Sequence, residues 1–164
     1  MMYRVLARPL ATALLAVGLI GLSSEAMAAS KTVIHGSDCE NNYPPNSSLG
    51  TDLYQSATGL RNGSTSWRYI VCPIPNVQGF SSGTLTDVDV AVYSTNPDMW
   101  CRVGSYDRYL STGNVSALRE ANGTGNRNID FGNPGLTSYY EGSFYVFCVL
   151  PAGGYIRSIA VDQN

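Results

Sequence analysis

Two copies of one cysteine motif constrain this chain more than any other feature. The stretches 69–75 and 145–151 both read Tyr, two apolar residues, Cys, one further residue, Ile or Leu, and Pro. Each is a strand-like run that ends in proline, and proline withdraws a backbone N–H group from any strand ladder. The sequence therefore predicts two β-strands, each with a cysteine close to its end.

Residues 1–28 have the organisation of a secretory signal peptide. Arg4 and Arg8 precede an apolar run, Leu10–Leu22, and small side chains surround Ala28. The apolar run is shorter than the roughly 20 residues that cross a bilayer, which argues against a retained membrane anchor. We expect cleavage after Ala28 and a secreted product, extracellular or periplasmic, with no membrane contact after cleavage.

The four cysteines all follow this segment, and an even number in an exported domain is most simply two disulfides. No Cys-x-x-Cys is present, and the single histidine, His35, has no second ligand near it in sequence, so a zinc site is not predicted. Three pairings are open to four cysteines. Each half of the chain offers a lone cysteine followed by one in the repeated motif, which favours pairing within each half. The predicted pairs are Cys39 with Cys72 and Cys101 with Cys148.

Strand patterns run through most of the remaining chain. Val88, Val90 and Val92 alternate with polar or small residues and predict a strand with one buried face. The stretch 142–150 is apolar at both alternations, which predicts a central strand covered on both faces. It should form a hairpin with 155–162, because the turn residues Pro-Ala-Gly-Gly lie between them.

About seven to nine short strands, separated by Gly, Asn, Pro and Ser, predict an all-β fold. We expect a two-sheet antiparallel β-sandwich of jelly-roll-like form, with a small β-barrel as the alternative. The mature chain divides into an N-terminal segment, 29–48, which carries Cys39, and a β-sandwich domain, 49–164. Two disulfides would staple this sandwich and add stability to a single small core.

The order of these features resembles that of a known set of proteins. The Cys-Pro-Ile-Pro motif at 72–75 is followed by "VDVAVY" at 88–93 and, near the end, by "GYIRSIAVD" at 154–162. In this the chain is similar to uncharacterised small exported bacterial proteins, hypothetical secreted proteins with a two-disulfide β framework. The resemblance covers most of Cys39 to Asp162 and implies fold and export. Its motifs belong to the disulfide framework, so it implies no catalytic residue.

No catalytic arrangement stands out. The stretch "GFSSG" at 79–83 formally matches a nucleophile elbow with Ser81 as nucleophile. A strand-like run follows where the elbow needs a helix, however, and His35 precedes Ser81 where the histidine should follow. Two facing carboxylates could support glycoside hydrolysis without a sequence signature. We predict a protein that is not an enzyme, with a small glycoside hydrolase or other carboxylate-dependent hydrolase as the less favoured alternative.

Ten basic and twelve acidic side chains give the chain a formal net charge of −2. The cations are dispersed, which excludes the clustered basic surface of a nucleic-acid-binding domain. Asp87 and Asp89 share one face of a strand and could seat calcium. Such a pair is more often part of a solvated sheet face, so we predict neither a metal site nor a cofactor.

Aromatic residues offer the main indication of binding. Trp67 lies in phase with Tyr69 and Val71, which favours a buried tryptophan. Trp100 is out of phase with its apolar neighbours and is the better candidate for exposure. Flat aromatic side chains suit sugar stacking, and neighbouring polar groups supply hydrogen bonds. The candidate ligand-binding residues are Trp100, Tyr106, Asp107, Arg108 and Tyr109.

These observations predict a non-catalytic exported β-sandwich protein with a structural or interaction role in the bacterial envelope or the extracellular space. The alternative is a carbohydrate- or ligand-binding module. The sequence does not identify the partner, for which a polysaccharide or another envelope or extracellular protein is a suitable class. Nucleic acid and the membrane are not predicted partners.

Overall fold

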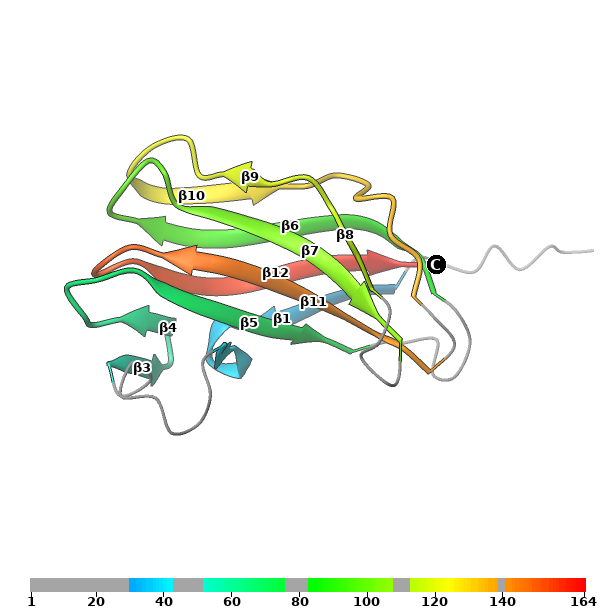
Figure 1. The fold of residues 1–164 in the computed structure, drawn as a ribbon, viewed down its shortest axis with the longest axis horizontal. Coiled ribbons are helices and arrows are strands. Elements are labelled where there is room, and N and C mark those ends of the chain that lie inside the picture. The colour runs from blue at the N-terminus through cyan, green and yellow to red at the C-terminus, as the bar shows by residue number, and fades with distance from the viewer. Residues whose placement is uncertain (1–29, 43–51, 76–82, 108–112, 139–140) are drawn as a thin grey trace, which may run out of the picture.

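The computed structural model describes residues 30–42, 52–75, 83–107, 113–138 and 141–164. Within these ranges the chain forms two six-stranded antiparallel sheets that pack against each other (Figure 1). The sheets do not close on one another. The predicted two-sheet sandwich is therefore confirmed, and the alternative of a small barrel is wrong.

Sheet A, as we name the first sheet, combines strands from both ends of the chain. Its order is β10-β6-β12-β4-β3, and β1 also pairs with β12. The strands are β1 (Ser30–His35), β3 (Leu53–Ser56), β4 (Gly59–Asn62), β6 (Leu85–Ser94), β10 (Gly125–Asp130) and β12 (Tyr155–Gln163). Strand β1, which lies in the segment 29–48, pairs with β12 from Ser30 to His35 and so takes part in sheet A.

Sheet B, the second sheet, has the order β2-β5-β11-β7-β8, and β9 also pairs with β7. Its strands are β2 (Glu40–Asn41), β5 (Arg68–Ile74), β7 (Trp100–Tyr106), β8 (Gly113–Val115), β9 (Arg119–Glu120) and β11 (Ser143–Leu150). A 3-10 turn, η1 (Gly36–Asp38), connects β1 to β2. In the described ranges, no helix has the length and apolar character needed to cross a membrane.

The central strand of sheet B is β11, as predicted, with β5 on one side and β7 on the other. Phe144 and Val146 are buried in the core, whereas Tyr145 and Phe147 are only half-buried on the outer face. The prediction that both faces are covered is therefore wrong. The predicted hairpin with β12 is also wrong, because β11 belongs to sheet B and β12 to sheet A. The turn after Pro151 carries the chain from one sheet to the other.

The core lies between the two sheets and takes alternate residues from each strand. In β6 the three valines predicted to face inward are fully buried or nearly so. They are Val88, Val90 and Val92. The alternation of β6 is easy to interpret because polar residues such as Asp87 and Asp89 occupy its other face.

In strand β5, the side of the strand that carries the aromatic residues faces solvent, and the other side faces the core. Ile70, Cys72 and Ile74 are buried, whereas Trp67 and Tyr69 are 37% and 40% exposed. The prediction that Trp67 is buried is therefore wrong. The cysteine decides the face: its disulfide lies in the core, and residues two positions apart on a strand share one side.

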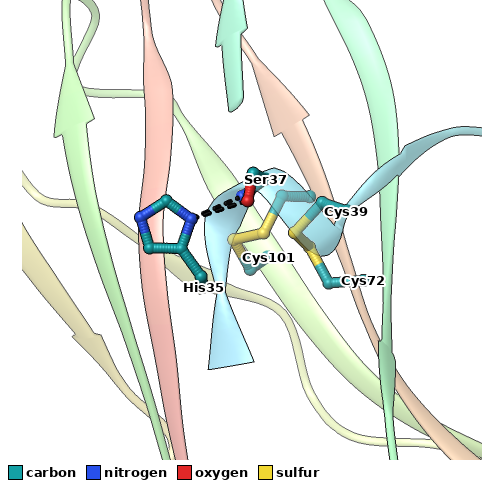
Figure 2. The surroundings of a disulfide bond; sticks show 6 residues. His35, Ser37, Cys39, Cys72 and Cys101 are labelled. Atoms are coloured by element: carbon teal, nitrogen blue, oxygen red, sulfur yellow. Dashed lines mark hydrogen bonds between the residues drawn. A yellow bond between two sulfur atoms is a disulfide. The ribbon is translucent and has the colours of Figure 1, made fainter. Parts of the chain in front are cut away.

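Both disulfides bridge neighbouring strands of sheet B on its inner face. Cys101 and Cys148 lie directly opposite each other on β7 and β11. Cys39, one residue before β2, is bonded to Cys72 of β5, and Figure 2 shows this bridge beside Cys101. All four cysteines are fully buried, and the predicted pairing is confirmed.

Candidate functional site

In the described part of the chain, the strands of sheet B carry five aromatic side chains on the outer face of the sheet, which we call the aromatic platform. Its members are Tyr69, Trp100, Tyr106, Tyr145 and Phe147. They come from three neighbouring strands, β5, β7 and β11. Each alternates with buried core residues, so the strand geometry places all five on the solvent side of the sheet.

The rings of the platform contact one another in two groups. Phe147 contacts both Tyr69 and Trp100, with ring centroids 5.9 and 5.7 Å apart respectively. Tyr106 and Tyr145 stack with centroids 4.8 Å apart and an angle of 10° between their planes. Separations of about 4.5 to 7 Å are those of attractive aromatic pairs. The platform is therefore stabilised by contacts between its own members.

Two glycines let the tyrosine pair lie against the sheet. Gly104 of β7 is opposite Tyr145, and Gly113 of β8 is opposite Tyr106. A Cβ atom at Gly104 would lie 2.2 Å from Cζ of Tyr145, and one at Gly113 would lie 2.5 Å from Cδ1 of Tyr106. The two rings thus occupy space that side chains at these positions would fill.

Arg102 places a cation on this face. It stands on β7 two residues after Trp100 and opposite Phe147. Its Cζ atom lies 5.6 Å from the centroid of the Trp100 ring, a cation–π distance, and its side chain is exposed. Among the described residues, no carboxylate forms an ion pair with Arg102.

An open groove of about 270 Å³ lies on the platform. Four of the aromatic residues and Arg102 line it, together with Val71 of β5. Asn42 comes from the β2 edge and Val115 from the β8 edge, so the groove crosses the strands over the width of the sheet. Mostly apolar walls with a few polar groups are typical of ligand-binding sites.

The hydroxyl group of Tyr145 remains protonated in this groove. Burial raises its pKa above the ordinary value of 10.0, and the hydrogen bond and charge interaction with Tyr106 raise the pKa further. Arg102 lowers the pKa by a smaller amount. At physiological pH the Tyr145 hydroxyl is therefore a neutral hydrogen-bonding group.

The structure brings together two of the five residues proposed from the sequence. Trp100 and Tyr106 belong to the platform. Asp107 follows β7 directly and is half-buried, with interactions of its own. Arg108 and Tyr109 lie outside the described residues.

Sequence reasoning missed the other platform residues, although the repeated motif contained a signal. In Tyr-x-x-Cys the tyrosine and the cysteine are three positions apart, an odd number, so on a strand they face opposite sides. Because Cys72 and Cys148 are buried in disulfides, Tyr69 and Tyr145 must lie on the outer face. The motif that forms the disulfide framework thus also supplies two rings of the platform.

The residues considered for catalysis do not converge on a site. His35 caps η1: its Nδ1 accepts a hydrogen bond from the backbone N–H of Ser37, and its Nε2 donates to the carbonyl oxygen of Ala57 (Figure 2 shows the contact with Ser37). All four cysteines form disulfides. Ser81 lies outside the described residues.

Four carboxylates gather on the outer face of sheet A, the opposite side of the sandwich. Asp89 lies opposite Asp130, and Asp87 lies opposite Asp162. Partial burial and the charges of the other three carboxylates raise the pKa of Asp87, and the charge of Lys31 lowers it by a smaller amount. In the part of the chain that the structure describes, no group of three or more His, Cys, Asp or Glu side chains is arranged to hold a metal ion.

Comparison with known proteins assigns no family. The chain matches no protein-family model and no curated protein. Among solved structures, a family two carbohydrate esterase from Cellvibrio japonicus is similar over 83% of this chain, with a TM-score of 0.42 and 8% sequence identity. The chain spans about a third of that protein's length, 34%. A likeness at this level assigns neither a family nor an activity.

Proposed function

We propose that this protein is an exported, non-catalytic binding module and that the aromatic platform is its carbohydrate-binding face. The observation that carries the proposal is the presence of five aromatic rings, in two contacting groups, on one solvent-facing side of sheet B. Sugar rings present apolar C–H faces and polar edges. Flat aromatic faces cover the C–H groups, while nearby polar side chains bind the hydroxyl groups at the ring edge.

The groove supplies the polar groups that such a ligand needs. Asn42 contributes an amide at one edge, Arg102 contributes N–H donors, and the tyrosine hydroxyls can donate or accept. Because the groove crosses the strands and is open to solvent, it suits a segment of an extended glycan chain better than a single enclosed molecule.

Export and the absence of catalysis belong to the same proposal. Two buried disulfides fit an oxidising compartment, which supports secretion to the periplasm or beyond the cell. The cysteines are bridged and His35 is engaged in capping a turn, so neither offers a free nucleophile or base. None of the described residues that line the platform groove is a carboxylate, whereas glycoside hydrolysis needs two.

An interaction with another envelope or extracellular protein is the second candidate. On the opposite sheet, Val33 of the edge strand β1 is 66% exposed. Beside it lies an apolar groove of about 470 Å³ that Ile34, Ile74 and Pro75 help to line. Edge strands with exposed apolar residues can pair with a strand of another protein.

Trp100→Ala tests the carbohydrate-binding proposal. Removing the ring takes away a stacking surface, and we expect the Kd for a bound polysaccharide to rise about tenfold, because roughly 1.4 kcal/mol of stacking corresponds to a factor of ten. Affinity electrophoresis in gels that contain individual polysaccharides measures this change. Thermal unfolding should show that the variant remains folded.

Tyr93→Ala is the matched control. Tyr93 stacks on Tyr155 with centroids 4.8 Å apart, but on the outer face of sheet A. Its loss should leave polysaccharide binding unchanged. Retardation by no polysaccharide in a broad set, or equal retardation of the wild type and Trp100→Ala, would overturn the proposed function and leave the protein–protein role as the better explanation.

A further inference from the structure

We infer that the groove on the aromatic platform takes a sugar that carries a carboxylate, and that Arg102 binds this carboxylate. The inference rests on the proposed function, because it specifies the glycan class that the platform would bind. Its basis is the charge of the groove. Arg102 is exposed, lines the groove, and lies over the Trp100 ring of the platform.

Arg102 differs from Arg68 and Arg127 in what it contacts. Arg68 is buried and forms an ion pair with Asp52 at 3.0 Å. Arg127 donates to the backbone carbonyl of Asn126. The guanidinium of Arg102 forms no hydrogen bond or ion pair within the described ranges, and its contact is with an aromatic ring. Its N–H groups are thus available to a ligand.

Acidic residues near the platform stand at its margins. Glu40 of β2 is opposite Val71, and Glu120 of β9 is opposite Trp100. Neither forms an ion pair with Arg102. The chain as a whole has a net charge of −2, so general attraction cannot explain the binding of an anion. Specific attraction for an anionic ligand on this face would come from Arg102, whose guanidinium has no ion pair among the described residues.

The geometry of a uronic acid matches this arrangement. Its carboxylate projects from the edge of the sugar ring, while the ring faces remain available for stacking. A sugar ring stacked on the platform beside Arg102, whose Cζ lies over the indole ring of Trp100 at 5.6 Å from its centroid, would present its edge to the guanidinium. A guanidinium can bind both carboxylate oxygens with parallel N–H donors, and stacking on an aromatic ring leaves these in-plane donors free.

The experiment compares acidic oligosaccharides with their neutral counterparts. The probes are oligosaccharides of galacturonate, glucuronate and mannuronate, each tested beside its methyl ester, which keeps the sugar ring and removes the charge. Titration calorimetry with the wild-type protein should give a Kd at least tenfold lower for an acid than for its ester. Salt should weaken binding of the acid and leave binding of the ester nearly unchanged.

Arg102→Met and Arg157→Met provide the matched pair of variants. Both arginines lie 5.6 Å over an aromatic ring, but Arg157 lies over Tyr155 on sheet A. Arg102→Met should remove the preference for the acid while retaining binding of the ester. Arg157→Met should retain the preference. Arg102→Lys, which keeps the charge but not the fork of donors, should retain part of it.

The outcomes separate this inference from the proposed function. Equal binding of acids and esters, lost together in Trp100→Ala, would overturn the inference and leave the carbohydrate-binding function standing. A preference for acids that survives in Arg102→Met would also overturn it. Binding of none of these acids or esters, while another polysaccharide binds, overturns the inference alone; binding of no glycan at all overturns both.

Discussion

Gly104 has no side chain, and this leaves the space on the sheet that the Tyr145 ring occupies. The Tyr145 ring lies over this glycine from the neighbouring strand, and an added Cβ would be 2.2 Å from its Cζ atom. An aromatic ring over a glycine partly offsets the poor fit of glycine to a strand. Because Tyr145 also stacks on Tyr106, a change at this single position reaches two rings of the platform.

We expect Gly104→Ala to destabilise the protein, although alanine is ordinarily the better strand residue. The new methyl group would displace the Tyr145 ring and break its stacking on Tyr106. The free energy of unfolding should fall by about 1 kcal/mol, the usual worth of such a pair. Urea unfolding followed by circular dichroism measures the change.

The same substitution in a Tyr145→Ala variant tests whether the Tyr145 ring is the group with which the new methyl group clashes. With the ring removed, the same Gly104→Ala change should be neutral or should stabilise the protein by up to about 1 kcal/mol, because glycine loses more backbone entropy on folding. An equal loss of stability in both backgrounds would contradict the explanation, since the clash would then lie with another group.

At the scale of a strand, the sequence shows alternation more clearly than it shows which face is buried. In β6 aspartates alternate with valines, so the inward face is evident from the sequence. In β5 both alternations carry large side chains, and the polar member, Arg68, is only 6% exposed. Its Nη2 donates to Asp52 at 3.0 Å, a tertiary contact that local pattern cannot reveal. The cysteine was the better guide to the face.

Alternation along a strand also predicts part of the platform, namely the exposure of Trp100. The phase of Trp100 against Met99 and Cys101, both of which are buried, predicts that Trp100 is exposed. The assembly of the rings, however, depends on register, since Phe147 lies opposite both Val71 and Arg102 on separate strands. Register between segments far apart in sequence is set by tertiary packing and is not visible in either segment alone.

The outer face of sheet A gives a prediction about pH. Partial burial and three neighbouring carboxylates raise the pKa of Asp87 in the folded protein above its ordinary value of 3.8. The folded state therefore holds this proton more tightly than the unfolded chain, and the ionised form costs stability at neutral pH. Asp87→Asn should raise Tm at pH 7. The gain should shrink as the pH falls through the raised pKa and should vanish below 3.8.

Asp98→Asn is the control for the effect of removing any surface carboxylate. Asp98 is exposed in the turn between β6 and β7, away from the four carboxylates of sheet A. Replacement of Asp98 should leave Tm nearly unchanged both at pH 7 and below pH 3.8. Differential scanning calorimetry at low and high salt completes the comparison, because salt screens repulsion between exposed charges. A lower Tm for Asp87→Asn at pH 7 would mean that the charged form of Asp87 stabilises the fold.

For the whole molecule, each disulfide also closes a loop of chain that contains strands of the other sheet. Both bridges lie within sheet B, yet each closes a stretch of chain that leaves this sheet and returns to it. Between Cys39 and Cys72 the chain forms β3 and β4 of sheet A, and between Cys101 and Cys148 it forms β10. The bridges therefore limit how far the segments that build sheet A can separate in the unfolded chain.

The size of these closed stretches predicts how much stability each bridge contributes. The cysteines are 33 and 47 residues apart in sequence. Loops of this length correspond to about 4 kcal/mol per bridge on the chain-entropy model, against about 5–15 kcal/mol for the net stability of a typical domain. Replacing either pair by alanine should leave a folded protein with a lower urea midpoint. Replacing both pairs should leave a protein that is largely unfolded at 37 °C.

Reduction of the wild-type protein separates loop closure from side-chain packing. Dithiothreitol in the unfolding buffer opens both bridges while the buried sulfur atoms remain, so the cavity cost of alanine is absent. If loop closure dominates, the reduced wild type should be nearly as unstable as the double-pair variant, because both unfolded chains can then expand freely. A reduced protein with the urea midpoint of the oxidised one would show that the two sheets hold together through core packing alone, and that the bridges contribute little to the stability of this sandwich.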